Sequence, residues 1–187
     1  MMNRVGYLLN AMGGLEGEPG FFYNYILGAN GLFIRAQGPL IEATVQIAHA
    51  DVRGLAPVRK SVRLNYGKIP WHIYDLAVSL FAAEPRREHY LAVVWDRGYR
   101  LRIPPQERDS AGVSYERLPH TLLDIHSHSL MSAFFSGTDN RDEQGLRLYM
   151  VVGGLDTMFP ETRLRVGVYG YYASLELHEV FGVQAGQ

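Results

Sequence analysis

The first third of the chain consists of short apolar runs interrupted by pairs that contain glycine or proline. Each run is rich in β-branched and aromatic residues, which favour strands, and pairs such as Asn30-Gly31 and Gly38-Pro39 favour turns. Because no cluster of reactive side chains accompanies these runs, we expect residues 1–66 to form a β-rich N-terminal cap or a docking region for a partner. The pattern predicts strands at Val5–Leu9, Phe21–Leu27, Leu32–Arg35 and Ile41–Ile47.

The pattern changes at Pro70, after which apolar residues recur at helical spacing. Residues at i, i+3, i+4, i+7 and i+8 lie on one face of a helix, so the spacing predicts an amphipathic helix over residues 72–83. Pro85 ends it, because proline lacks the amide hydrogen that a helix needs. The apolar residues in question are Ile73, Leu76, Ala77, Leu80 and Phe81.

Beyond this helix, apolar runs alternate with polar and glycine-containing stretches. A second, shorter helix is predicted from Asp139 to about Leu146, since acidic residues in its first turns suit the positive end of a helix dipole. Helices that alternate with strands predict an α/β or α+β domain over residues 67–187. The predicted strands are Tyr90–Trp95, Tyr99–Ile103, Val113–Arg117, Thr121–His128, Leu148–Val152 and Leu164–Tyr172.

Composition narrows the classes of partner and of site. The 187 residues are 47% hydrophobic and 20% charged with a net charge of -1, so no strong field attracts nucleic acid or an acidic membrane. The absence of cysteine excludes thiolate metal sites and cysteine nucleophiles. No apolar run reaches the roughly 18 residues of a membrane span, and no signal peptide is evident. We therefore expect a cytoplasmic protein without membrane or nucleic-acid partners.

The stretch His126-Ser-His128 carries the most distinctive chemistry of the chain. In a strand, residues i and i+2 point to the same face, so the two imidazoles are expected side by side. Zinc binds imidazole nitrogens and accepts a carboxylate as a further ligand, and Asp139 is the nearest downstream candidate. Three protein ligands leave a fourth position for water, which is typical of a catalytic zinc site.

The wider spacing H-x-H-x7-S-x2-D, formed by His126, His128, Ser136 and Asp139, resembles the signature of the JAMM (MPN-plus) metalloprotease family. The resemblance is greatest to the prokaryotic branch, in particular to members encoded in the PRTRC cassette beside a ThiF-like, E1-like protein. It covers about residues 67–181. It implies a JAB/MPN-type mixed β-sheet flanked by helices, similar to cytidine deaminases, with Zn²⁺ held by the two histidines and the aspartate.

The resemblance also implies a function, a zinc-dependent peptidase or isopeptidase of the deubiquitinase-like type. In the family a glutamate that opens a strand after the first helix is the general base, and Glu88 occupies that place here. The family's serine, here Ser136, donates a hydrogen bond to the oxyanion of the intermediate. A substrate with a ubiquitin-like or sulfur-carrier-like tail and a ThiF/E1-like partner would accord with the family.

Several alternatives remain open beside this hypothesis. Glu84, at the end of the predicted helix, is a second candidate for the base, and Ser136 also suits an N-terminal helix cap. Phe134 and Phe135 can line a substrate groove or anchor the loop in the core. The whole domain can be a non-catalytic MPN-type binding scaffold. A zinc deaminase is disfavoured because its usual site needs cysteine ligands.

Overall fold

The computed structural model describes residues 3–109, 112–115 and 118–183. The chain is mostly β, with 48% strand and 13% helix. Among the described residues only one helix, α1 (Trp71–Ala83), is longer than two turns. The expected α/β (α+β) class, a JAB/MPN-type mixed sheet flanked by helices, is therefore wrong. The reason is that segments expected to be connections pair instead as strands and hairpins.

The chain forms two compact units. The first unit comprises Met1–Asn65, Gln144–Leu146 and Val166–Ala173. The second comprises Tyr66–Glu143, Arg147–Arg165 and Ser174–Gln187. Residues distant in the sequence thus complete the first unit, and the chain passes between the units more than once.

A six-stranded sheet in the order β2-β1-β3-β4-β5-β6 dominates the first unit. Neighbouring strands are antiparallel except β1 and β3, which run parallel. Leu8, Ile26 and Phe33 pack on one face of this sheet, with Val58 from a long connection against them. The strands are β1 (Val5–Ala11), β2 (Gly14–Glu18), β3 (Tyr23–Gly28), β4 (Gly31–Gln37), β5 (Ile41–Ala48) and β6 (Ser61–Leu64).

The second six-stranded sheet has the order β15-β14-β13-β12-β8-β9. β12 lies at the centre, antiparallel to β8 and parallel to β13, and in this register His126 faces Tyr90 on one side and Val151 on the other. Burial along β8, β12 and β13 is nearly continuous, as expected of strands covered on both faces. The strands are β8 (Tyr90–Trp95), β9 (Tyr99–Arg102), β12 (Thr121–Ser127), β13 (Leu146–Gly153), β14 (Glu161–Val168) and β15 (Tyr171–Leu175).

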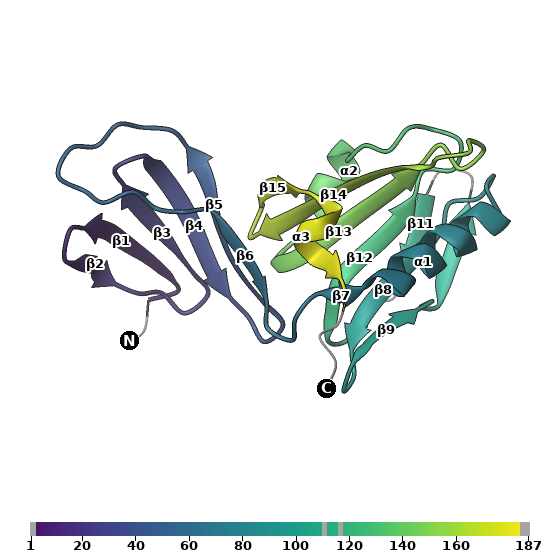
Figure 1. Ribbon diagram of the computed structural model, residues 1–187, viewed down its shortest axis with the longest axis horizontal. Coiled ribbons are helices and arrows are strands. Elements are labelled where there is room, and N and C mark those ends of the chain that lie inside the picture. The colour runs from purple at the N-terminus through teal and green to yellow at the C-terminus, as the bar shows by residue number, and fades with distance from the viewer. Residues whose placement is uncertain (1–2, 110–111, 116–117, 184–187) are drawn as a thin grey trace. The chain divides into compact units, whose positions relative to one another are not determined.

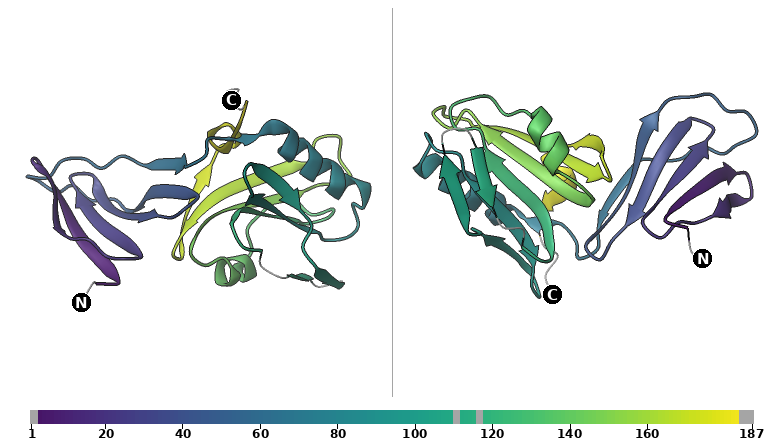
Figure 2. Two further views of the ribbon diagram at one scale, coloured as in Figure 1. Left: turned by 90° about the horizontal axis from the view of Figure 1, so that it is seen from below. Right: turned by 180° about the vertical axis from the view of Figure 1, so that it is seen from behind.

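Short elements complete the second unit. α1 covers one face of the sheet and buries Ile73, Ala77 and Phe81, whereas α2 lies on the opposite face (Figures 1 and 2). No helix in the described part of the chain is long and apolar enough to span a membrane. The remaining elements are β7 (Ile69–Pro70), β10 (Gln106–Asp109), β11 (Gly112–Tyr115), α2 (Gly137–Asp142), α3 (Leu177–Val180) and β16 (Phe181–Gly182).

The predicted elements match the structure where the apolar spacing is regular, and they differ from it where a turn ends an element earlier than expected. The helix expected over 72–83 is confirmed as α1, but the helix expected from Asp139 to Leu146 ends at Asp142. The strand expected over Leu164–Tyr172 is two strands, because the chain turns at Tyr169 and Gly170, which both have positive φ. The expected strand Val113–Arg117 is seen as β11, and its residues 116–117 lie outside the described part.

Candidate metal centre

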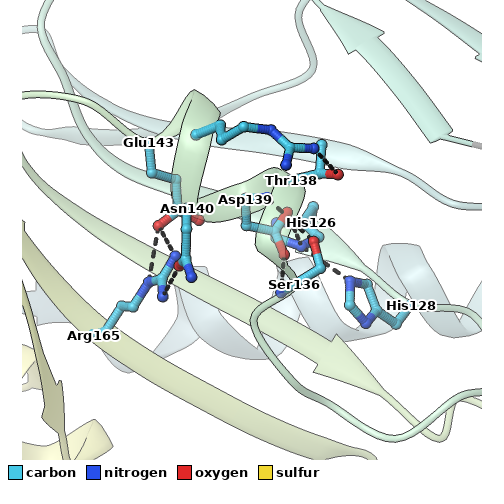
Figure 3. Close-up of polar contacts among 9 residues, drawn as sticks. His126, His128, Ser136, Thr138, Asp139, Asn140, Glu143 and Arg165 are labelled. Carbon is cyan, nitrogen blue, oxygen red and sulfur yellow. Dashed lines mark hydrogen bonds and ion pairs between the residues drawn. The ribbon is translucent and has the colours of Figure 1, made fainter. Parts of the chain in front are cut away.

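β12 and the residue that follows it present the two motif histidines on one face of the sheet. His126 belongs to β12, and His128 continues its path by donating its backbone N–H to Val152 O at 2.8 Å. Strand alternation places Ile125 and Ser127, both fully buried, on the other face. The two imidazoles therefore stand side by side with their Nε2 atoms 3.2 Å apart (Figure 3).

Asp139 reaches the histidines from the first turn of α2, where a capping box fixes its carboxylate. Its Oδ2 accepts the backbone N–H of Ser136 at 2.5 Å, and its own N–H donates to Ser136 Oγ at 3.1 Å. Its other oxygen, Oδ1, lies 3.5 Å from His126 Nε2. One carboxylate oxygen thus serves the helix terminus, and the other faces the imidazoles.

The spacing of these groups fits a small divalent cation. Among the described residues, one ligand atom each of His126, His128 and Asp139 lies within 4.8 Å of the others. Zinc holds ligands at about 2.0–2.1 Å, and tetrahedral geometry then separates them by roughly 3.3 Å. The separations of 3.2 and 3.5 Å agree with that value. Two Nε2 atoms that face each other this closely also require either a ring proton or a cation between them.

Burial keeps His126 neutral, as a metal ligand must be. Desolvation lowers the pKa of His126 to about 4, with Asp139 acting in the opposite direction and His128 and Arg165 adding to the decrease. The Nδ1 atom of His128 is buried without a hydrogen-bond partner among the described residues. Neutral imidazoles offer a lone pair at neutral pH, so protons do not compete strongly with a metal at His126.

Arg165 of β14 attaches α2 to the sheet. Its guanidinium donates from Nε and Nη2 to Glu143 Oε2, with the Nε bond at 2.8 Å, and from Nη1 to Asn140 Oδ1 at 2.8 Å (Figure 3). The same group stacks on the Phe135 ring, 3.7 Å from its centroid. Both ends of the short helix are therefore fixed, by Ser136 at the start and by Arg165 at the end.

The buried partner of Arg165 has an unusual protonation equilibrium. Burial raises the pKa of Glu143 to about 7, and this effect outweighs the lowering by Arg165. Glu143 caps the C-terminal end of α2 and is almost inaccessible to solvent. The anchor of the helix thus contains a carboxyl group that is sensitive to pH near neutrality.

Asp124 lies on the same face of β12 as His126, two residues before it. In the structure its Oδ1 accepts the Tyr90 hydroxyl, and its Oδ2 accepts Arg147 Nη1 at 2.9 Å. Both oxygens thus serve a buried network between β8, β12 and β13. Asp124 therefore supports the sheet beneath the site and does not orient an imidazole.

Glu88 lies two residues before β8, beyond the last residues that β8 and β12 pair, Tyr90 and His126. Ser127 N donates to His89 O, and His89 N donates to Ser127 Oγ, each at 3.0 Å, so the pairing of β8 with β12 continues past Tyr90. If the same alternation continued for one further residue, Glu88 would stand opposite His128, on the face that carries the imidazoles. Its half-buried side chain is not one of the group of potential metal ligands.

Glu84, the second candidate base, has a different environment. Its carboxylate is 52% exposed and lies 3.5 Å from Arg87 Nη1 and 3.8 Å from His89 Nε2. The His89 ring packs near Phe81 of α1, with ring centroids 6.0 Å apart, so it belongs to the α1 side of the sheet. Glu84 is thereby directed away from the face that carries His126 and His128.

Ser136 is half-buried at the start of α2 and is the N-cap residue of that helix. Its hydroxyl oxygen accepts the Asp139 N–H, and no described residue accepts its hydrogen. Ser136 is thus the helix cap that the sequence suggested, and its hydroxyl hydrogen remains available for another acceptor. Capping and donation to a substrate are compatible in this geometry.

Two aromatic residues of the loop after His128 have separate roles. The Phe134 ring packs edge-on against the His128 ring at 4.5 Å between centroids, yet the side chain remains 45% exposed. Phe135 lies beneath the Arg165 guanidinium. Sequence reasoning did not identify Arg165 or Glu143, because no local motif links a strand arginine to a helix end 22 residues away.

No family model matches the chain, and the search of curated proteins finds no significant match. The function of the protein must therefore be inferred from the geometry of the candidate centre and from its sequence motif.

Proposed function

We propose that this protein is a zinc-dependent hydrolase of peptide or isopeptide bonds. The observation that carries the proposal is the convergence of His126, His128 and Asp139 at distances suited to a metal. The motif's resemblance to the JAMM signature supplies the reaction class. Three ligands from the protein leave room for water, as in catalytic rather than structural zinc sites.

When bound, zinc would supply a Lewis acid and a water acidic enough to ionise near neutral pH. Glu88 would take a proton from water at the site and deliver it to the departing amine. Ser136 donates its free hydroxyl hydrogen to the carbonyl oxygen as negative charge develops there. One C–N bond and one water O–H bond are broken to give a carboxylic acid and an amine, and the acid proton then passes to the amine to leave a carboxylate and an ammonium group, so no further reactant is needed.

The substrate in this proposal is a protein or peptide with an extended tail, ubiquitin-like or sulfur-carrier-like. A ThiF/E1-like protein is the proposed partner. Both extensions rest on the motif's resemblance alone. An extended tail can bind along a strand through backbone hydrogen bonds. Such binding would bring the peptide bond of the tail to the metal centre.

Metal content per chain tests the proposal first. Purified wild type is expected to hold about one zinc per chain, since three ligands bind it tightly. The double variant His126→Ala/His128→Ala should hold none. His72→Ala is the matched control, because His72 is exposed on α1, and it should retain the metal.

Hydrolysis is then measured on the zinc-loaded protein. Glu88→Gln should keep zinc and lose at least about 100-fold in rate, the usual effect of removing a general base. Wild type that holds no metal even after zinc is supplied would instead identify the protein as a non-catalytic binding scaffold. Full activity in Glu88→Gln would leave the hydrolase in place and remove Glu88 from the mechanism.

A further inference from the structure

Five large apolar side chains lie exposed on two loops beside the candidate metal centre. One loop, residues 129–135, follows β12, and the other, residues 154–160, connects β13 with β14. Each of the five side chains is between 45% and 86% exposed. We call this set the apolar rim: Leu130, Met131, Phe134, Met158 and Phe159.

The two loops of the apolar rim lie side by side. Gly154 N donates to Met131 O at 2.6 Å, and Leu155 N donates to Ser129 O at 3.1 Å. A Cβ at Gly153 would lie 2.4 Å from Met131 O, so only glycine permits this approach. The two loops that carry the exposed apolar side chains are therefore joined through their backbones.

The apolar rim is continuous with the candidate ligands. Met131 N donates to His128 O at 2.9 Å, and the Phe134 ring packs against the His128 ring. Residues 129–136 contain no charged side chain, and residues 154–160 contain only Asp156. A group bound at the metal centre would thus adjoin loops whose own side chains are almost uncharged, although the Glu161 carboxylate, which follows the second loop, accepts the Ala133 N–H at 3.3 Å.

We infer that the apolar rim is the subsite for a large apolar side chain of the substrate, adjacent to the bond that is hydrolysed. The inference rests on the proposed hydrolase function and adds substrate selectivity to it. Exposed apolar patches mark binding sites, and methionine adapts its shape to varied apolar partners. The lack of charge on both loops favours a leucine-like or phenylalanine-like residue over a lysine or glutamate. Because the proposed metal centre hydrolyses peptide bonds, the group that binds at the adjacent apolar rim is part of an extended peptide.

Two labelled peptides that differ at one position, leucine in one and serine in the other, test this subsite on the full zinc-loaded chain. Fluorescence anisotropy measures binding, and mass spectrometry measures cleavage. Wild type should bind the leucine peptide about tenfold more tightly, a typical discrimination by an apolar pocket. Met158→Ser/Phe159→Ser should lose this preference and keep its zinc. Asp156→Ser changes an exposed residue of the same loop and should keep both the preference for leucine and the zinc.

The possible outcomes separate the two proposals. A zinc-loaded, active wild type that does not distinguish the peptides would overturn the subsite and leave the hydrolase intact. So would a double variant that keeps the preference of the wild type. A chain without zinc, or one with zinc that cleaves neither peptide, would overturn the hydrolase and the subsite with it. Loss of preference in Met158→Ser/Phe159→Ser, with unchanged zinc and intact preference in Asp156→Ser, supports the subsite.

Discussion

At the scale of single residues, Asp139 combines two tasks in one carboxylate. Oδ2 accepts the backbone N–H of Ser136, and Oδ1 faces His126 at 3.5 Å. The helix terminus therefore holds the carboxylate in the orientation that a metal ligand needs, without a separate partner. A substitution of Asp139 can therefore remove the metal ligand and keep the acceptor of the Ser136 N–H.

Asp139→Asn should weaken zinc binding by more than about 100-fold, which exceeds the usual effect of changing a residue that merely orients a ligand. An asparagine oxygen still accepts the Ser136 N–H, so the melting temperature of the metal-free protein should barely change. Competition with a chromophoric chelator measures the affinity. Asp156→Asn removes the same charge on an exposed loop and serves as the control. Wild-type affinity in Asp139→Asn would exclude Asp139 as a ligand.

Ser136 can be examined in the same way, because its hydroxyl accepts one hydrogen bond and keeps its own hydrogen. Ser136→Ala should cost about 1 kcal/mol of stability through loss of the cap. Ser136→Asp caps equally well but has no hydrogen to donate when ionised. We expect it to unfold like wild type in urea and to hydrolyse substrate at least tenfold more slowly. Equal activity in Ser136→Asp would restrict Ser136 to capping.

At the scale of elements, α2 is too short to form without tertiary support. A helix of six residues has little intrinsic stability, since nucleation is costly and few hydrogen bonds follow it. The capping box and the contacts of Arg165 with Glu143 and Asn140 provide that support. The position of Asp139 therefore depends on an arginine that is distant in sequence.

Arg165→Ala should lower the free energy of unfolding by about 1.5–3 kcal/mol at pH 7, because it removes charge-assisted hydrogen bonds to Glu143 and Asn140. Chemical denaturation measures the change, and zinc affinity should fall with it. Arg163→Ala lies two residues away on β14 at an exposed position and should change stability by less than about 0.5 kcal/mol. Similar losses in both variants would show that Arg165 is not an anchor.

The pH dependence of Arg165→Ala follows from Glu143. Its pKa in the folded protein, about 7, exceeds that of an unfolded glutamate, and loss of Arg165 removes a lowering influence. The folded state then binds more protons than the unfolded state between the two pKa values, so stability falls as pH rises through this range. Wild type and variant share this fall below pH 7, and only above the wild-type pKa of about 7 does the variant keep a proton that wild type releases, so the destabilisation should be larger at pH 8 than at pH 6. An equal destabilisation at the two pH values would contradict a Glu143 pKa that depends on Arg165.

The sequence predicts elements whose pattern is local and misses those that depend on pairing. α1 and β12 follow from helical spacing and an apolar run, and the convergence of His126 with His128 follows from strand alternation. β2 is entirely exposed and glycine-containing, so it has no strand pattern and exists because it pairs with β1. Such pairings account for the error in fold class, because they convert expected loops into hairpins.

At the scale of the whole molecule, the first unit is completed by residues 166–173, which belong to β14 and β15. Val166 and Val168 are fully buried, and the Tyr169 ring lies 4.8 Å from that of Tyr23. The Tyr171 and Tyr25 hydroxyls are 3.0 Å apart. The later strands therefore need the N-terminal residues for their own burial, although they follow the candidate metal centre in sequence.

Deletion of residues 1–65 should consequently destabilise the rest of the chain, since residues 166–173 lose the partners within their unit. We expect a lower melting temperature, stronger binding of a hydrophobic dye and weaker zinc binding than in the full chain. Tyr25→Phe in the full chain removes a single hydroxyl contact and should cost only about 1 kcal/mol, which separates that contact from the packing as a whole. A truncated chain that melts cooperatively at the wild-type temperature and binds zinc equally well would contradict this dependence. It would mean that the strands which follow the centre are stable without the first unit.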